Sequence, residues 1–355
     1  MKYKTILITG GAGFIGSNLA VAFKKRYRDL NIICLDNLKR RGSELNLALL
    51  REYNVRFIHA DIRCPEDLML DKKIDLLIEC SAEPSVLAGY ENPAYIINTN
   101  LNGTVNCLEL CRKHRADIIF LSTSRVYPYE AINVIKAKEL SSRFEWVSGQ
   151  NIPGWSNNGF SEGFTTNGAK TFYGATKLAS ELMMREFMAN YGIKGVINRC
   201  GVIAGPGQFG KVDQGIFTFW MLAHYFKKNV KYIGFSGKGK QVRDVLHVND
   251  LFELLDLQIK DMAKLSGQIF NVGGGRHSNL SLVEATRICH KISGNRIKIA
   301  KDLKNRPGDI NIYITDNKKV TQATGWKPRS CPVEILEDIF EWIGKNEALI
   351  TRSIL

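Results

Sequence analysis

Several common signals are missing from this sequence, beginning with any hydrophobic run long enough to cross a membrane. The most apolar stretch, residues 215–226, is shorter than the roughly 20 residues that a membrane-spanning helix needs, and Lys227 and Lys228 follow it. The N-terminus leads into a short apolar run at residues 5–9 and lacks the apolar segment of about 7–15 residues found in secretory signals. We therefore expect a soluble, cytoplasmic protein that does not bind membranes.

Patterns typical of metal sites and disulfide frameworks are missing as well. The eight cysteines contain no C-x-x-C pair, and the six histidines contain no H-x-x-x-H or H-E-x-x-H pair. Residues 234–241 have the glycine and lysine spacing of a phosphate-binding P-loop, but Gln241 stands where a Ser or Thr would bind Mg²⁺. We expect reduced thiols in the core, no bound metal and no ATPase activity.

Acidic residues are fewer than basic ones, 35 against 49, which gives a net charge of +14. This excess favours an anionic partner such as nucleic acid, a membrane surface or a phosphorylated small molecule. No zinc-finger, RNP or basic-zipper pattern accompanies the charge, and the densest basic run is confined to residues 39–41. We expect a basic solvated surface with one phosphate site, and no nucleic-acid binding.

The first half of the 355-residue chain alternates short apolar runs with segments long enough for a helix each. This alternation is typical of an α/β fold with a doubly wound parallel sheet, whose strands are joined by crossover helices. The apolar runs are residues 5–9, 32–35, 55–59, 76–79 and 118–122. Two later runs, 194–203 and 268–272, would extend the sheet, and the sequence between them then belongs to a second, smaller and discontinuous α/β domain.

Three glycines, Gly10, Gly13 and Gly16, lie between the first apolar run and a helical pattern. A strand that turns directly into a helix needs backbone with positive φ and close approach to a pyrophosphate, while the helix N-terminus offers free N–H groups. Asp36 lies 20 residues after Gly16, where a carboxylate accepts the hydroxyls of an adenosine ribose. The pattern predicts a Rossmann-type dinucleotide site. Asp36 favours NAD over NADP, although the basic residues 39–41 would attract a 2′-phosphate.

Tyr173 and Lys177 are four residues apart at the start of a predicted helix, which puts them on one face. A tyrosine, with an ordinary pKa of ~10, is a poor base at neutral pH, but a neighbouring ammonium and a positively charged nicotinamide stabilise its phenolate. Such a pair is common by chance. Together with the glycine turn, it predicts a catalytic base and its activator.

These features, over essentially the full length of the chain, resemble the extended short-chain dehydrogenase/reductase family of nucleotide-sugar epimerases and dehydratases. The strand end at residues 122–127 resembles the segment that supplies the active-site Ser or Thr, and that position is Thr123. Asp61-Ile62 resembles the adenine-contacting pair, and Asn100 lies in a segment like the family's Asn-x-x-Gly-Thr helix. The resemblance implies these NAD-binding residues: Gly10, Gly13, Phe14, Ile15, Gly16, Asp36, Asn37, Asp61, Ile62, Ser81, Ala82, Asn100, Tyr173 and Lys177.

The resemblance also implies a mechanism of transient oxidation. Tyr173 takes the proton of a sugar hydroxyl while the carbon gives a hydride to NAD, Thr123 hydrogen-bonds the reacting oxygen, and Lys177 holds the ribose and lowers the tyrosine pKa. The ketone then turns and is reduced on its other face, so the expected enzyme is an epimerase without net redox change. A homodimer or homotetramer is implied as well, in which segments 94–114 and 177–191 pack as a four-helix bundle.

The residues after Thr123 bear on the subclass. Sugar-nucleotide 4,6-dehydratases carry Asp-Glu there, whereas this chain has Ser124-Arg125, which disfavours dehydration. Motifs within 199–215 and 239–247 are most similar to the CDP-paratose (tyvelose) 2-epimerases, which invert C2 of a dideoxy sugar on CDP. A UDP-hexose 4-epimerase, a net nucleotide-sugar reductase, and a non-enzymatic NAD(P)-sensing or nucleic-acid-binding protein remain alternatives.

Substrate contacts are expected mainly from arginines, because a guanidinium binds a diphosphate with two parallel hydrogen bonds. Arg243 and Arg306 are the candidates, with surface salt bridges as the alternative for each. Looser candidates for contact with the sugar or base are Glu83, Gln208, Asp213 and Gln214. Glu83 has the alternative of capping the turn before Pro84.

The long stretch 128–169 is rich in glycine and is interpreted as an active-site loop or lid. The domain boundaries follow from the apolar runs and the site residues together. We expect residues 1–199 and 243–273 to form the NAD-binding Rossmann domain, and residues 200–242 and 274–355 to form the nucleotide-sugar-binding domain.

Overall fold

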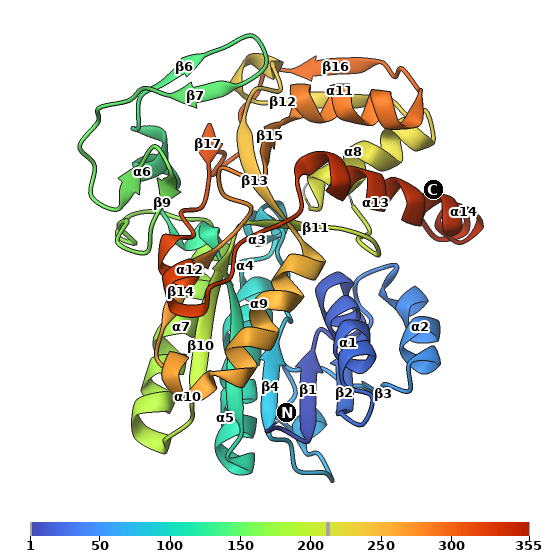
Figure 1. Ribbon diagram of the computed structural model, residues 1–355, viewed down its shortest axis with the longest axis vertical. Helices are drawn as coiled ribbons and strands as arrows, with labels where there is room; N and C mark the ends of the chain where they lie inside the picture. Colours follow the sequence, from blue (N-terminus) through green and yellow to red (C-terminus); the bar gives the residue numbers. More distant parts are fainter. Residues whose placement is uncertain (1, 211–213, 355) are drawn as a thin grey trace. The chain divides into compact units, whose positions relative to one another are not determined.

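The computed structural model describes residues 2–210 and 214–354, which divide into two compact units (Figure 1). Unit 1 comprises Met1–Thr123, Phe172–Arg199 and Leu251–Phe270, and unit 2 comprises Ser124–Thr171, Cys200–Asp250 and Asn271–Leu355. The segments 124–171 and 243–250, which we expected beside the NAD-binding residues, thus group with unit 2. The division of NAD and substrate binding between two domains stays a prediction.

Unit 1 is built on a seven-stranded sheet with the order β14-β10-β5-β4-β1-β2-β3. The strands are β1 (Thr5–Thr9), β2 (Asn31–Asp36), β3 (Arg56–His59), β4 (Leu76–Glu79), β5 (Asp117–Thr123), β10 (Gly195–Cys200) and β14 (Ile269–Val272). The pairs β1-β2, β1-β4, β2-β3 and β4-β5 are all parallel. The predicted doubly wound α/β class is therefore confirmed.

The chain reverses its direction across the sheet at β1. It adds β2 and β3 on one side of β1 and then returns to add β4 on the other side. Such a reversal is where doubly wound sheets bind ligands, outside the carboxyl ends of the strands. The carboxyl ends of β1 and β4 are adjacent, since Thr9 pairs with Glu79.

The expected strand at 194–203 was wrong in one respect, because it is two strands rather than one. The chain leaves the seven-stranded sheet after β10 and forms β11 (Val202–Ala204) in another sheet. The break falls at Gly201, where a Cβ would lie 2.8 Å from Oδ1 of the buried Asp244. The run does not reveal such a change of sheet, since both strands are largely buried and only one residue separates them.

Helices cover both faces of the unit 1 sheet. Because crossover connections are right-handed and the chain reverses at β1, the helix after β1 and the helix before β5 lie on opposite faces. Leu7 of β1, Leu77 of β4 and Ile118 of β5 belong to one hydrophobic core, which also includes residues of α5 and α7. The helices are α1 (Phe14–Arg26), α2 (Asn46–Glu52), α3 (Val86–Glu91), α4 (Pro93–Ile96), α5 (Gly103–His114), α7 (Phe172–Tyr191), α9 (Val248–Lys260) and α10 (Met262–Leu265).

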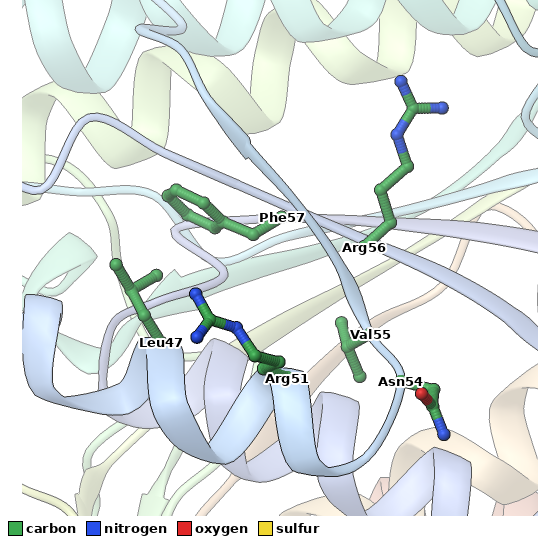
Figure 2. A pocket seen from close by; sticks show the side chains of 6 residues that line it. All are labelled: Leu47, Arg51, Asn54, Val55, Arg56 and Phe57. Atoms are coloured by element: carbon green, nitrogen blue, oxygen red, sulfur yellow. The ribbon is translucent and has the colours of Figure 1, made fainter.

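A hollow of about 430 Å³ lies at the outer edge of this sheet, between α2 and the edge strand β3 (Figure 2). The chain turns sharply between these elements at Asn54, whose φ is 54°. Arg51 and Arg56 line the hollow, and both are exposed. Short edge strands with charged side chains resist pairing with another chain, and β3 has only four residues and carries the exposed Arg56.

Unit 2 contains a smaller mixed sheet. Its strand β13 (Val242–His247) pairs in parallel with β11 and β17 (Ile312–Tyr313) and antiparallel with β15 (Asn279–Ser281). A separate parallel pair joins β12 (Val230–Ile233) to β16 (Ile299–Asp302). The expected α/β character of the smaller domain is thus present in this unit.

Three helices of unit 2 enclose a second core. They are α8 (Ile216–Tyr225), α11 (Leu282–Ser293) and α13 (Pro332–Lys345). The core includes Trp220, Cys289 and Ile339, each at most 1% exposed. A capping box, formed by Ser281 and Glu284, begins α11. The remaining helices are α6 (Tyr129–Asn133), α12 (Lys318–Thr324) and α14 (Glu347–Ile354).

The long stretch after Pro128 is a fixed part of unit 2. It forms two small hairpins, β6 (Ala137–Glu139) with β7 (Phe144–Trp146) and β8 (Trp155–Ser156) with β9 (Gly159–Phe160). Phe160 is fully buried and stacks on Tyr313 with ring centroids 5.1 Å apart. The interpretation of the stretch as an active-site loop or lid stays a prediction.

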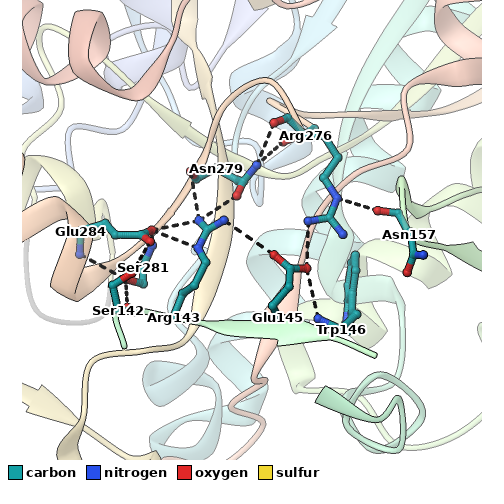
Figure 3. Close-up of polar contacts among 10 residues, drawn as sticks. Ser142, Arg143, Glu145, Trp146, Asn157, Arg276, Asn279, Ser281 and Glu284 are labelled. Atoms are coloured by element: carbon teal, nitrogen blue, oxygen red, sulfur yellow. Dashed lines mark hydrogen bonds and ion pairs between the residues drawn. The ribbon is translucent and has the colours of Figure 1, made fainter. Parts of the chain in front are cut away.

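A polar network joins the β6-β7 hairpin to β15 and α11 (Figure 3). Arg143 donates to Glu284 at 2.9 Å and to Asn279 at 2.8 Å. Arg276 donates to Glu145 on β7 at 3.0 Å, and its guanidinium lies 5.0 Å from the ring of Trp146. Arg143 and Glu145 of the hairpin are therefore paired within unit 2.

Two features are absent from the described residues: a membrane-spanning helix and a cluster of metal-binding side chains. No helix among them combines the length and apolarity needed to cross a bilayer. Residues 2–210 and 214–354 also contain no group of three or more His, Cys, Asp or Glu side chains arranged to hold a metal ion.

Candidate active site

The glycine turn after β1 closes too tightly for side chains. Gly10 has a φ of 63°, and its carbonyl accepts a hydrogen bond from the Gly13 N–H at 3.0 Å. A Cβ on Gly16 would lie 2.3 Å from that carbonyl oxygen, so only glycine fits there. Helix α1 then begins at Phe14 with no side-chain cap and no acidic residue in its first turn. Its N–H groups and positive dipole end therefore suit a pyrophosphate.

Asp36 ends β2 beside this turn. One of its carboxylate oxygens accepts from the Ala12 N–H at 3.2 Å and the other from the Leu38 N–H at 2.8 Å. Burial raises the pKa of Asp36, while these backbone donors oppose the rise. Asn46 on α2 also donates to the Ala12 carbonyl at 2.8 Å. The expected ribose acceptor is thus held against the glycine turn, as a bound dinucleotide would require.

The expected adenine-contacting segment has a partner that the sequence pattern did not reveal. Arg63 binds the Asp61 carboxylate through two nitrogens and is the main cause of the lowered pKa of Asp61. Asn37 donates to the same carboxylate at 2.9 Å. Ile62 packs where a Cβ on Gly103 would lie, 2.5 Å from its Cδ1. Asn37, Asp61 and Ile62 therefore form one continuous part of the predicted site.

Asn100 connects the end of β4 to the helices beside it. It lies in a π-helical turn, Ile97–Asn102, between α4 and α5, within the segment 94–114 that was expected to be helical. Its side chain accepts from the Glu83 N–H at 2.8 Å and donates to the Glu83 carbonyl at 3.1 Å. It also donates to the Thr176 hydroxyl at 3.4 Å. Asn100 thereby clamps the segment that carries Ser81 and Ala82, and π-turns often mark functional sites.

The three expected catalytic residues all lie in unit 1. Thr123 is the last residue of β5, and Tyr173 and Lys177 lie one turn apart at the start of α7. Tyr173 is half-buried, whereas Lys177 is 1% exposed. The Lys177 ammonium lies 3.3 Å from Oε2 of Glu79, the last residue of β4, and 4.3 Å from the ring centroid of Phe120. Glu79 is a site residue that the sequence analysis missed, since it looked like the end of an apolar run.

A second buried ion pair lies one turn further along α7. Glu181 accepts hydrogen bonds from Nε and Nη2 of Arg199 on β10, the shortest at 2.7 Å, and one from the Ser122 hydroxyl. All three side chains are buried. This group ties α7 to β5 and β10, and therefore holds the helix that carries Tyr173 and Lys177 in register with Thr123.

The expected diphosphate ligands gather in unit 2 around one acid, Asp309. Arg243 donates to the Asp309 carboxylate at 3.1 Å, and the Arg306 guanidinium lies 3.8 Å from the same group. Arg125 donates to the Gly308 carbonyl at 2.9 Å. Burial lowers the pKa of Arg243 to about 9, Asp309 opposes this, and the charges of Arg125 and Arg306 lower it further. The sequence analysis marked Arg125 only as a departure and did not assign it to this cluster.

The looser substrate candidates differ in their surroundings. Gln208 uses both ends of its amide inside unit 2, donating to the Ile203 carbonyl at 3.0 Å and accepting from Thr218 at 2.6 Å. Glu83 accepts from the Ser85 N–H at 3.1 Å, as a turn cap would. Gln214 precedes α8 and is half-buried. Asp213 lies outside the described residues.

Comparisons with known proteins identify the family of the chain. The NAD dependent epimerase/dehydratase family matches residues 6–273. The chain is 31% identical to the CDP-paratose 2-epimerase of Salmonella typhi over 95% of this chain and 98% of that protein. It is 30% identical to a putative UDP-glucose 4-epimerase of Methanocaldococcus jannaschii, over 96% of this chain and 99% of that protein. The UDP-glucose 4-epimerase of Thermotoga maritima, solved with UDP-glucose, shares the fold, with 24% identity, a TM-score of 0.78, and coverage of 97% and 99%.

The expected Rossmann fold and cofactor are therefore confirmed. The glycine turn fits a pyrophosphate, Asp36 fits a ribose, and the family match begins at Ile6 in the strand before that turn. The chain is an enzyme that uses NAD, and it belongs to the NAD-dependent epimerase/dehydratase family of nucleotide-sugar enzymes.

Proposed function

We propose that the enzyme is a nucleotide-sugar epimerase that inverts C2 of a CDP-linked deoxyhexose, by transient oxidation to a ketone and re-reduction. The observation that carries the epimerase class is that one compact unit holds the glycine turn together with Thr123, Tyr173 and Lys177. The CDP-sugar and the C2 position rest on the 31% identity to the CDP-paratose 2-epimerase of Salmonella typhi. Ser124-Arg125, in place of Asp-Glu, supports epimerisation over dehydration.

The cofactor would be held by the predicted residues of unit 1. The N–H groups at the start of α1 would bind the pyrophosphate, Asp36 the adenosine ribose, and the 81–82 segment would lie beside the nicotinamide. Bound NAD supplies a hydride acceptor that can return the hydride. No metal ion is needed in this scheme.

The chain's own residues move the proton. Tyr173, as the phenolate, accepts the proton of the sugar hydroxyl while the C–H bond electrons leave the same carbon as hydride. Thr123 donates a hydrogen bond to the reacting oxygen, and the Lys177 ammonium favours the charged form of Tyr173. After the ketone turns its other face, Tyr173 returns the proton as the hydride comes back. Substrate and product then differ only in configuration.

The arginine cluster of unit 2 is the proposed binding site for the diphosphate. Arg243 and Arg306 contact the carboxylate of Asp309, and Arg125 donates to the carbonyl of the preceding Gly308, so three guanidiniums lie close together. A nucleotide-sugar diphosphate carries two negative charges, which such a group of cations would attract. Arginines suit this task because their planar groups bind phosphate oxygens in pairs.

We further propose a homodimer or homotetramer formed through α5 and α7. Support comes from the exposed apolar side chains on α7: Leu182 and Tyr191 are each 56% exposed, and Met183 is 36% exposed. Apolar side chains grouped on one helix are typical of an interface. Light scattering after size exclusion would measure the mass, and a single 39.9 kDa species would contradict the proposal. The cytoplasmic location stays a prediction.

Incubation of the purified enzyme with CDP-paratose, without added NADH, tests the reaction. We expect its C2 epimer to accumulate until both epimers are present, with no net consumption of NADH. A substrate labelled with deuterium at C2 should retain the label, because the same hydride returns to the same carbon. A requirement for stoichiometric NADH would identify a reductase instead.

The main alternative is a UDP-hexose 4-epimerase, which the 30% identity to the putative UDP-glucose 4-epimerase of Methanocaldococcus jannaschii supports. The same assay with UDP-glucose separates the two. Formation of UDP-galactose faster than epimerisation of the CDP-sugar would replace our proposal by this alternative.

A further inference from the structure

Glu79 is a fully buried carboxylate that the proposed reaction does not use. It ends β4 in the middle of the seven-stranded sheet, between β1 and β5, and has 0% exposure. Its Oε2 lies 3.3 Å from the Lys177 ammonium, which is itself 1% exposed. Burying two charges costs several kcal/mol for each, so an isolated structural pair is often replaceable by apolar side chains. The position of this pair beside the predicted catalytic residues calls for a functional explanation.

The surroundings of the pair contain few other charges. On α5, Cys107 faces it, and the pKa of that thiol is raised by burial first and by the Glu79 charge second. On α7 the next acid, Glu181, is neutralised by Arg199 of β10. On β1 the neighbour in register is the uncharged Thr9. Lys177 is thus the only charged partner of Glu79 within the described residues.

The contacts of Lys177 show what Glu79 contributes. The ammonium rests over the Phe120 ring at 4.3 Å and against Glu79 at 3.3 Å. Burial raises the pKa of Glu79, and the Lys177 charge opposes that rise. The Lys177 ammonium therefore favours the charged form of Glu79, and this carboxylate offsets part of the positive charge of the ammonium.

We propose that Glu79 is a positioning residue, which holds the Lys177 ammonium beside the end of β4 and offsets part of the positive charge that Lys177 presents to Tyr173. This inference rests on the proposed roles of Tyr173 and Lys177. Glu79 touches neither sugar nor cofactor in this scheme and acts only through the lysine. It also joins the lysine to the strand that leads into Ser81 and Ala82.

Direct titration of Tyr173 tests the proposal without any sugar. Titration of a tyrosine, whose free phenol has a pKa of ~10, can be followed by the absorption of tyrosinate at about 295 nm. The difference between the NAD-bound enzyme and its Tyr173→Phe variant isolates this residue from the other 11 of the 12 tyrosines. In Glu79→Gln, which keeps the shape but removes the charge, the midpoint should move to lower pH by about 1 unit, because an opposite-charge partner shifts such groups by roughly 1–3 units.

The matched control is Glu79→Asp, which keeps the charge. Its tyrosinate midpoint should lie close to that of the parent, while Glu79→Gln differs from both. A structural role alone would lower the melting temperature of the variants and leave the midpoint in place. An unchanged or raised midpoint in a folded, NAD-binding Glu79→Gln protein overturns the proposal.

The outcome is separable from the identity of the substrate. If the midpoint shifts but no CDP-sugar is epimerised, the role of Glu79 stands and the proposed function fails. If the CDP-sugar is epimerised but the midpoint does not shift, the function stands and the role of Glu79 fails. If the difference between the NAD-bound enzyme and its Tyr173→Phe variant shows no titrating phenol, both the base role of Tyr173 and this inference fail.

Discussion

The two units treat buried charge in opposite ways. In unit 1 each buried cation near the site has its own acid: Lys177 has Glu79, and Arg199 has Glu181. In unit 2 Arg243 and Arg306 both contact Asp309, Arg125 donates to the Gly308 carbonyl, and the neighbouring buried acid, Asp244, accepts from backbone N–H groups of Gly275 and Thr315. Pairs of one cation and one acid hold side chains in position. The grouped arginines of unit 2 agree instead with the proposed role of that unit in binding an anion.

The strongest test of this comparison is Tyr173→Phe in unit 1. We expect turnover to fall by about 10³-fold, since general acid–base groups contribute roughly 10²–10⁴-fold. NAD binding should change little, because the glycine turn and Asp36 are untouched. Stopped-flow rates and a binding titration measure the two quantities. Activity retained within tenfold would remove Tyr173 from its role as base.

The second test concerns the unpaired acid of unit 2. Burial raises the pKa of Asp244 from 3.8 to about 6, so the folded state binds this proton more tightly than the unfolded state. The resulting stability is fully present below pH 3.8 and is lost as the pH rises to about 6, a loss of about 3 kcal/mol at ~1.4 kcal/mol per pKa unit. Urea unfolding should therefore show that the free energy of unfolding of the parent falls between pH 4 and 7. This fall should be missing in Asp244→Asn. Parallel curves for the two proteins would contradict the assignment.

The third test removes single cations from the arginine cluster. Arg306→Met and Arg125→Met should each raise KM for the nucleotide sugar about tenfold, which corresponds to ~1.4 kcal/mol. NAD affinity should be unchanged. The matched control is Lys238→Met, since Lys238 pairs with Glu139 on the surface and is 44% exposed. An equal rise in KM for the control would show that only net charge matters.

The smallest expected effect concerns cofactor choice. Asp36→Asn removes the negative charge at the ribose and keeps an acceptor oxygen for only one of the Ala12 and Leu38 N–H groups. The preference for NAD over NADP should fall about fivefold, since the acidic residue at this position bonds the ribose 2′-hydroxyl. Dissociation constants for both cofactors provide the measurement. Unchanged selectivity would place the ribose elsewhere.

Local pattern predicted most of unit 1. The apolar runs at 5–9 and 76–79 are strands with those bounds, because a strand buried on both faces must be apolar throughout. The glycine spacing predicted the turn, since steric crowding at Gly16 depends only on the local backbone. The run at 194–203 was predicted as one strand but forms two. The break depends on the close approach of Gly201 to Asp244, and these residues are far apart in the chain.

The same distinction separates the site residues that were predicted from those that were missed. Tyr173 and Lys177 were predicted because helix geometry places residues four apart on one face. Glu79 was missed, since its partner Lys177 is 98 residues away and comes from another element. Arg125 was noted but not assigned to the cluster, because Asp309 and Gly308 reach it through the tertiary fold of unit 2.

By itself, the sequence determined the α/β class and the dinucleotide turn and predicted the proposed catalytic pair, because each depends on spacing within one or two neighbouring elements. Only the tertiary structure decided which charges pair: Glu79 with Lys177, Glu181 with Arg199, and Asp309 with Arg243 and Arg306. Charge pairing acts over a few ångströms in space, and residues that are distant along the chain meet at that range only once the sheet and helices have packed.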